Sequence, residues 1–203
     1  MPITPSRPQP PTLELTGFYR ISVEQYRRMI DAGILVCGEP AELLEGFLVS
    51  QPRPASPRVA SSRTRIHYAF ADYEFPNWCF HLVGALTLSD SEPEPDFALV
   101  RGDISTHDKR FPGPGEVGIV GEVCDSSLQF DRREKGRIYA RAGIPIYWII
   151  NVIDRQIEVY TNPQPAATPP EYTTRTDYPH GTSVPVVLDG VTVATLAVAD
   201  LIP

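Results

Sequence analysis

Residues 118–151 read GIVGEVCDSSLQFDRREKGRIYARAGIPIYWIIN, two strongly apolar segments separated by a charged one. The apolar segments, 118–124 and 146–151, are rich in Ile, Val and aromatic residues, which predicts two buried strands. Between them, residues 131–142 have helical spacing, and Gly143 and Pro145 end the helix. Because such apolar strands must be covered, we predict an α/β or α+β fold in which helices flank a central mixed sheet.

The flanking segments supply the other elements. Ser22, followed three residues later by Gln25, forms a capping box and predicts a helix that ends at Gly33. We further expect a hairpin around Gly46 in ELLEGFLV, a helix over 57–74, strands over 78–88 and 96–100, a strand over 156–160 antiparallel to 146–151, and a hairpin over 184–193 that turns at Asp189–Gly190.

The prolines suggest how the chain is organised. Five of them lie within the first eleven residues, so we expect residues 1–17 to form a Pro-rich N-terminal arm. Residues 18–203 then form a single domain, with a Pro-rich loop over 161–183 and a C-terminal β-hairpin over 184–203. A chain of 203 residues is long enough for one domain with a sizeable core.

Charge and cysteine content exclude several classes of protein. The net charge of −7 counts against a general nucleic-acid coat, although it allows a local basic surface. Cys37, Cys79 and Cys124 form no CxxC pair, so neither a zinc knuckle nor a disulfide framework is indicated. The first residues lack a signal-peptide pattern, and no apolar run approaches the roughly 20 residues that cross a bilayer. These features predict a soluble cytoplasmic protein with no membrane association.

Two carboxylates lie in or beside apolar strands. Asp96 follows Pro93 and Pro95 at the start of one strand, and Glu122 lies inside another. A buried carboxylate is costly unless it is paired or bound to a cation, and two carboxylates in one cleft repel each other. Bound Mg²⁺ or Mn²⁺ would remove that cost. The alternative for Glu122 is an ion pair with a nearby arginine.

The helix over 131–142 points a cation inward. Asp131, Lys135, Ile138 and Ala142 form one stripe that ends apolar, while Arg133, Arg137 and Arg141 form the outward stripe. A lysine near a helix N-terminus is disfavoured by the helix dipole, so a negative group, either Glu122 or a substrate phosphate, should lie close to Lys135. Asp131, with Glu134 three residues later, has the spacing of an N-cap.

These residues carry a family resemblance. Pro95-Asp96 followed by Glu122-Val123 resembles the PD-(D/E)XK pattern of the restriction-endonuclease-like superfamily. The run from Glu122 to Lys135, then YARAGIP and YWIIN, is similar to the Uma family, small bacterial endonuclease-like proteins that were formerly a domain of unknown function. The segments SVEQY and ELLEG agree as well, so the resemblance covers about residues 18–160.

The resemblance implies a metal-dependent phosphodiesterase core with a central mixed sheet. By motif position, Glu42 matches the early acidic residue, and Asp96 and Glu122 match the two ligands of Mg²⁺ (or Mn²⁺). The superfamily lysine would stand at Cys124, on the same strand face as Glu122. Lys135 is the implied replacement, so the implied catalytic residues are Glu42, Asp96, Glu122 and Lys135. Glu45 is a rival to Glu42, and the family histidine after the Pro-rich stretch is absent from SPRVA at 56–60.

Two basic stretches, residues 46–71 and 129–141, flank these carboxylates and are compatible with a nucleic-acid substrate. The alternative is that they are solvated helix faces. We expect DNA as the substrate, with RNA not excluded, and a homodimer in which strands 146–151 and 156–160 could pair between subunits. Two rival functions stay open, a non-catalytic nucleic-acid or protein binding module and a metal hydrolase of small phosphoesters. The candidate nucleic-acid-binding residues are Arg53, Arg58, Arg63, Arg65, Arg133 and Arg137.

Overall fold

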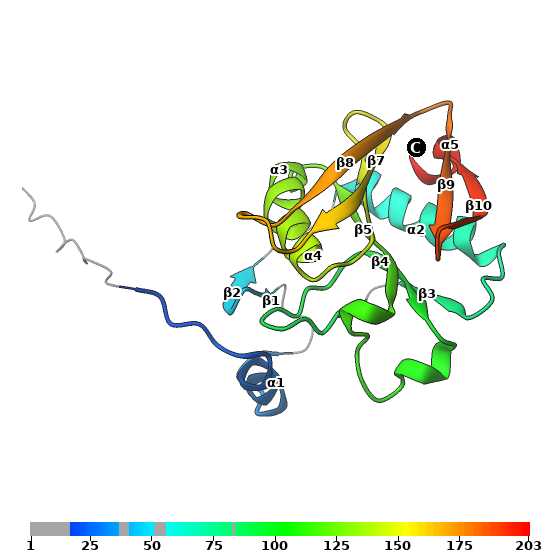
Figure 1. The fold of residues 1–203 in the computed structure, drawn as a ribbon. Helices are drawn as coiled ribbons and strands as arrows, with labels where there is room; N and C mark the ends of the chain where they lie inside the picture. Colours follow the sequence, from blue (N-terminus) through cyan, green and yellow to red (C-terminus); the bar gives the residue numbers. More distant parts are fainter. Residues whose placement is uncertain (1–16, 37–40, 51–55, 83) are drawn as a thin grey trace, which may run out of the picture.

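The computed structural model describes residues 17–36, 41–50, 56–82 and 84–203, and at its centre lies a six-stranded sheet (Figure 1). The expected N-terminal arm lies almost wholly, and Arg53 entirely, outside the described residues. The sheet has the order β3-β4-β5-β6-β7-β8. Its strands are β3 (Trp78–Leu82), β4 (Phe97–Arg101), β5 (Val117–Cys124), β6 (Ile146–Asn151), β7 (Gln156–Gln164) and β8 (Glu171–Pro179).

The sheet is mixed, as the sequence predicted. β5 and β6 run parallel, with Glu122 opposite Ile149, and every other neighbouring pair is antiparallel. Parallel neighbours need a crossover connection, and here a helix over residues 128–141 provides it. This β5–helix–β6 unit places Glu122 in the centre of the sheet, directly under the helix that carries Lys135.

One face of the sheet carries the larger apolar core. Helix α2 (Pro57–Ala71) packs there through Val59, Ile66 and Phe70, beneath the hairpin β9 (Ser183–Leu188) and β10 (Val191–Ala197) and the short helix α5 (Val198–Leu201). Pro57 at the first helical turn and the Ser56 N-cap begin α2 as helix-start rules require. The C-terminal hairpin turns at Asp189–Gly190, as predicted.

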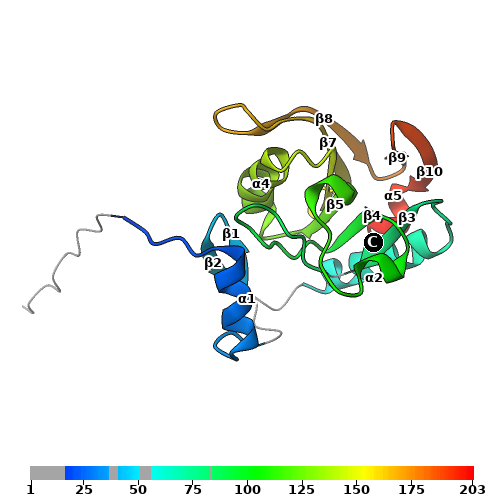
Figure 2. The same ribbon diagram turned by 60° about the horizontal axis from the view of Figure 1, so that its bottom comes forward.

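The opposite face packs against α4 (Gly136–Arg141) and the hairpin β1 (Ala41–Leu44) and β2 (Phe47–Ser50). Figure 2 shows α4 and α2 on opposite sides of the sheet, and helix α1 (Val23–Asp31) beside the β1–β2 hairpin. The predicted capping box of α1 is present, with Ser22 and Gln25 bonded to each other's backbone N–H groups. This second face holds the buried polar residues described below.

Three expectations from the sequence were wrong in detail. The strand expected over 78–88 ends at Leu82, because Leu86 and Leu88 bury their side chains from a turn whose N–H groups bond to Pro93 and Ser91. The Pro-rich segment 161–183 is mostly the β7–β8 hairpin rather than a loop. Its prolines fall at the turn, in the edge strand β8, or, for Pro163, beyond Thr161, the last β7 residue that pairs with β6. Strands β6 and β7 are each paired on both sides, so neither has a free edge to pair between subunits.

The crossover helix contains a π-helical turn that the sequence did not predict. The helix begins with α3 (Leu128–Phe130), continues through the π turn η3 (Asp131–Lys135) and ends as α4. Asp131 therefore lies inside the helix and is buried, and the expectation that it caps the N-terminus was wrong. The π turn keeps Asp131 and Lys135, four positions apart, on the side of the helix that faces the sheet, where helical spacing had already placed them.

Strand β7 carries a buried carboxylate, Glu158. The Glu158 carboxylate is fully buried and accepts hydrogen bonds from Asn151 (2.9 Å), Tyr160 (2.8 Å) and Arg132, whose Nε lies 3.0 Å from Oε2. Burial alone would raise the pKa of Glu158, but these hydrogen bonds, together with Arg175, lower it to about 2. The carboxylate therefore stays ionised in the folded protein well below the pH at which it would take up a proton in the unfolded chain.

This arrangement predicts how stability depends on acid. Because the folded pKa lies below the unfolded value, the contribution of Glu158 is complete above about pH 5 and is lost as the pH falls toward 2. We expect a loss on the order of 3 kcal/mol over that range. Urea unfolding of the wild type and Glu158→Gln should show a difference in free energy that shrinks steadily below pH 5. Glu24→Gln, which removes an exposed surface pair with Arg28, is the control and should change the unfolding free energy by at most about 0.5 kcal/mol.

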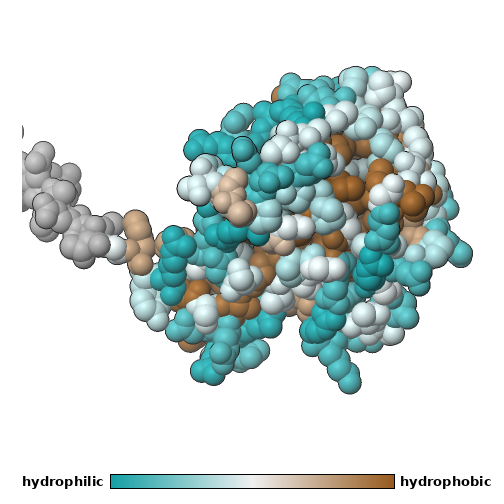
Figure 3. Space-filling view, in the orientation of Figure 1, coloured by the Kyte–Doolittle hydropathy of each residue, from teal (hydrophilic) through white to brown (hydrophobic). Residues whose placement is uncertain are grey.

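The surface differs between regions of the molecule. Figure 3 shows a largely hydrophilic area over α3 and α4 and a strip of hydrophobic residues over β7 and β9. Within the described ranges, no helix is both long enough and apolar enough to cross a bilayer.

Candidate functional site

Five charged side chains meet beneath the crossover helix, between β1, the start of β4 and the middle of β5. Each is at most 9% exposed, which is rare for ionisable residues unless they are paired. They come from parts of the chain that are far apart in sequence, so the fold alone brings them together. The residues are Glu42, Asp96, Glu122, Asp131 and Lys135.

Lys135 is the centre of this cluster. Its Nζ lies 2.9 Å from Glu122 Oε1 and 3.1 Å from Glu42 Oε2. Burial would lower the pKa of Lys135, but Glu122, Glu42 and Asp131 outweigh it, and the pKa is raised above its ordinary value. The ammonium is therefore charged at neutral pH and cannot act as a base; it can only attract and donate hydrogen bonds.

Glu122 lies in an environment that opposes its charge. Burial raises the pKa of this carboxyl well above its usual range; Lys135 lowers it, and Asp131, Asp96 and Glu42 raise it further. Oε1 also accepts a hydrogen bond from the buried Tyr139 hydroxyl at 2.7 Å. Both described donors bind Oε1, which leaves Oε2 as the oxygen open to another ligand.

Asp96 is held by different partners. Its Oδ2 accepts a hydrogen bond from the backbone N–H of Val123 at 2.7 Å, and its Oδ1 forms an ion pair with Arg63 Nε at 2.6 Å. Burial raises the pKa of Asp96, while Arg63, Val123 and Lys135 oppose that rise. The Val123 contact fixes Asp96 directly beside Glu122 on β5.

The β1–β2 hairpin separates the roles of the two rival glutamates. Glu42 points into the cluster, where Oε2 also accepts the Glu94 backbone N–H at 3.2 Å. Glu45, in the turn, points away and forms a two-pronged pair with Arg137 at 2.5 and 2.7 Å, and a further pair with Arg141. Glu42 is therefore the glutamate that contacts Lys135, and Glu45 ties the hairpin to α4.

The cluster holds more carboxyl groups than cations, which suits a further cation. Its four carboxyls lie near two cations, Lys135 and Arg63, and the pKa values of Glu122 and Asp96 are raised, so a bound cation would favour their ionised forms. Carboxylate oxygens are the donors that Mg²⁺ and Mn²⁺ prefer. In the described part of the chain no three Asp, Glu, His or Cys side chains already converge as a metal cage. Mg²⁺ commonly uses only one or two carboxylates, with water and substrate phosphate completing its shell, so Asp96 and Glu122 could hold it.

Cys124 occupies the position where the superfamily pattern has lysine. Burial first, and then the hydrogen-bonded carboxylate of Asp131, raise the pKa of this thiol well above its ordinary value. Cys124 is therefore a neutral thiol and supplies no charge to the cluster. Lys135 provides the positive charge instead, from the helix above the same strand face.

Sequence reasoning did not assign to the site two residues that the structure places in or against this cluster, Asp131 and Tyr139. Tyr139 was noted only as part of a family run, although it lies four residues after the inward-facing Lys135 and so shares its stripe. Asp131 was interpreted as a cap, because its spacing to Glu134 does not reveal the π turn. The sequence predicted that Glu122 or a substrate phosphate lies close to Lys135; Glu122 does, and the other described contact of Lys135 is with Glu42.

The predicted nucleic-acid-binding arginines do not form one group. Arg58 and Arg65 are exposed on α2, and Arg133 is exposed on the crossover helix. Arg63 is paired with Asp96, and Arg137 with Glu45 and Glu134. The exposed three remain candidates for phosphate contact, whereas Arg137 has a structural role.

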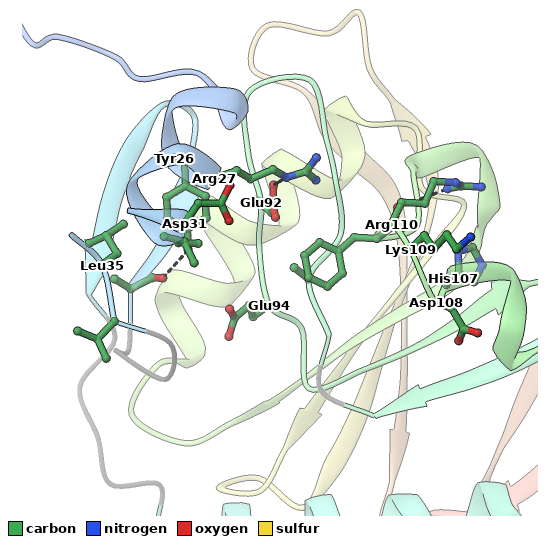
Figure 4. Close-up of a pocket in the computed structure, with 15 residues that line it drawn as sticks. Tyr26, Arg27, Asp31, Leu35, Glu92, Glu94, His107, Asp108, Lys109 and Arg110 are labelled. Carbon is green, nitrogen blue, oxygen red and sulfur yellow. Dashed lines mark hydrogen bonds and ion pairs between the residues drawn. The ribbon is translucent and has the colours of Figure 1, made fainter. Parts of the chain in front are cut away.

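A groove of about 520 Å³ lies next to the start of β1; Ala41 lines it, but none of the five cluster residues does (Figure 4). One wall is α1 with Tyr26 and Arg27; the other is the segment 107–111, which follows β4. Glu94, whose N–H binds Glu42, lines the groove between them. A ligand in the groove would lie next to the strand that carries Glu42.

Comparisons with known proteins agree with this architecture. A protein from Anabaena variabilis, described as "a putative nuclease belonging to DUF820", has a similar fold, with a TM-score of 0.58 and 16% sequence identity over 89% of this chain and 97% of that one. The comparison with curated proteins returned no match. The profile of the Uma2 family, described as "Putative restriction endonuclease", matches residues 23–198. That match takes in every residue of the buried cluster and confirms the resemblance drawn from the sequence, so the chain belongs to the Uma2 family.

Proposed function

We propose that this protein is a divalent-cation-dependent endonuclease that hydrolyses phosphodiester bonds in DNA. The observation that carries the proposal is the Lys135 ammonium, buried 2.9 Å from Glu122 on the central strand while Asp96 lies alongside. A pair of carboxylates and a fixed cation in one place supply what phosphodiester hydrolysis needs, namely a cation site and a group that stabilises developing negative charge.

The proposed roles follow from the contacts of each side chain. Asp96 and Glu122 would hold Mg²⁺ or Mn²⁺, which when bound activates water and neutralises charge on the scissile phosphate. Lys135, which stays protonated, would donate a hydrogen bond to a phosphate oxygen as its charge grows. Glu42 positions Lys135 through their ion pair, and Tyr139 positions Glu122 through its hydrogen bond.

The substrate proposal depends on charge at the surface. Arg58, Arg65 and Arg133 are exposed on the two helices that flank the sheet, where they could contact a phosphate backbone. The groove beside Glu94 has room for part of a nucleic-acid strand. DNA is the first substrate to test, and a matching RNA forms the second arm of the assay.

Two measurements on the wild type and Glu122→Gln test the proposal: calorimetric titration with Mn²⁺, then nicking of a supercoiled plasmid. We expect the wild type to bind Mn²⁺ and nick the plasmid. Glu122→Gln, which removes one ligand charge but keeps the shape of the side chain, should lose at least about 10²-fold in nicking together with metal affinity. Its circular dichroism spectrum should match that of the wild type.

Other outcomes separate the rival functions. Metal binding without cleavage of plasmid or RNA, but with hydrolysis of a small phosphodiester, would identify a small-phosphoester hydrolase. A wild type that binds duplex DNA or a protein but no Mn²⁺ would identify a binding module that keeps the fold without the reaction.

A further inference from the structure

We propose that Arg63 competes with the divalent cation for Asp96: it holds the carboxylate in the metal-free protein and, once displaced, contacts a phosphate of the substrate. The inference rests on the proposed function and deepens it, because it assigns one arginine of that site a role in metal exchange and phosphate binding.

The first observation is that both oxygens of Asp96 are engaged. Oδ2 accepts the N–H of Val123, a backbone group fixed within the central strand. Oδ1 lies 2.6 Å from Arg63 Nε. A cation that binds Asp96 at Oδ1 must therefore replace the guanidinium, because the backbone partner of Oδ2 cannot leave without breaking β5.

The second observation is that the two cationic side chains, Lys135 and Arg63, differ in how easily they can move into solvent. The Lys135 side chain is 2% exposed, and leaving the cluster would strip two buried carboxylates of their partner. The Arg63 side chain is 42% exposed on a long stem from α2. Arg63 can thus swing into solvent at little desolvation cost, while Lys135 is confined to the cluster.

The third observation concerns where a released Arg63 would lie. It belongs to α2, whose Arg58 and Arg65 are also exposed. α2 packs against β5, the strand that carries Glu122. A bound cation repels the guanidinium, and a substrate phosphate near that cation attracts it, so both forces favour the exchange.

Calorimetric titration with Mn²⁺ tests the competition in the wild type, Arg63→Gln and Arg65→Gln. Arg65→Gln is the matched control, because it removes the same charge from the same helix two positions away, where the side chain is exposed. We expect Arg63→Gln to bind Mn²⁺ about fivefold more tightly or better, and Arg65→Gln to change the dissociation constant by less than about twofold. Thermal melts establish that all three proteins are folded.

A second measurement tests the phosphate contact. The affinity for a phosphorothioate duplex, which resists hydrolysis, is measured with Mn²⁺ over a series of salt concentrations. Losing one phosphate contact should lower the slope of log K against log salt by about 0.9 in Arg63→Gln.

The outcomes separate the two proposals. If the wild type and Arg63→Gln both fail to bind Mn²⁺, the proposed function falls and this inference falls with it. If the wild type binds Mn²⁺ but Arg63→Gln binds equally or more weakly, Arg63 does not compete for Asp96 and only this inference is overturned. An unchanged salt slope overturns the phosphate contact alone.

Discussion

Lys135→Met should abolish most plasmid nicking and also weaken the fold. Methionine fills nearly the same volume but leaves Glu42 and Glu122 buried without their cation. Removing one partner of a buried ion pair costs about 3–5 kcal/mol, and removing a donor that stabilises transition-state charge costs about 10²–10³ in rate. Urea unfolding and initial nicking rates measure the two effects separately.

Two further variants show whether the lost stability comes from uncompensated charge. Lys135→Met combined with Glu122→Gln should be more stable than Lys135→Met alone, because it removes one buried carboxylate that lacks a partner. Lys109→Met changes the only other lysine in the chain, which is exposed, and should alter the unfolding free energy by about 0.5 kcal/mol at most. A Lys135→Met protein that nicks at the wild-type rate would contradict the proposed role of Lys135.

Gly121→Ala should be the most damaging small substitution in the sheet. A Cβ at this position would lie 2.1 Å from two ring atoms of Phe97, its partner on β4. The Phe97 ring is 1% exposed and contacts the rings of Phe70, Phe80 and Trp148, so it has nowhere to move. We expect at least about 3 kcal/mol of destabilisation, measured by urea unfolding, or failure to fold.

Gly115→Ala is the matched control for this variant. A Cβ there meets nothing within 4 Å, so stability should stay within about 0.5 kcal/mol of the wild type or rise slightly. Adding Phe97→Leu to Gly121→Ala should recover part of the loss, because the smaller side chain leaves room for the methyl group. Equal stability of the Gly121→Ala and Gly115→Ala proteins would show that β4 and β5 tolerate the overlap.

Local signals in the sequence predicted most elements of the fold. The capping box at Ser22, the turn at Gly46 and the strand Ile146–Asn151 were all identified, because each depends on neighbouring residues alone. The β7–β8 hairpin was missed because its prolines lie at a turn and a sheet edge, and strand order cannot be read from composition. Leu86 and Leu88 have the spacing of inward-facing strand residues, but they are buried because the turn that carries them packs against the sheet. That packing cannot be inferred from the local sequence.

The candidate site was predictable where an ionisable residue lay in an apolar pattern, as at Glu122 and Lys135. Motif position alone favoured Glu42 over Glu45, and the hairpin geometry agrees, since only Glu42 contacts Lys135. The partners of each group could not be foreseen. The contacts of Arg63 with Asp96 and of Tyr139 with Glu122 depend on how α2 and α4 pack against opposite faces of the sheet.

The contact between Glu42 and Lys135 joins residues 93 positions apart. Closing a contact of such long range costs more loop entropy than closing a local one and slows folding. While the chain is being synthesised, Glu42, Asp96 and Glu122 all leave the ribosome before Lys135, the residue that joins Glu42 to Glu122. Whatever chemistry the cluster performs is therefore a property of the finished domain, and a nascent or truncated chain that ends before residue 135 is inert by construction.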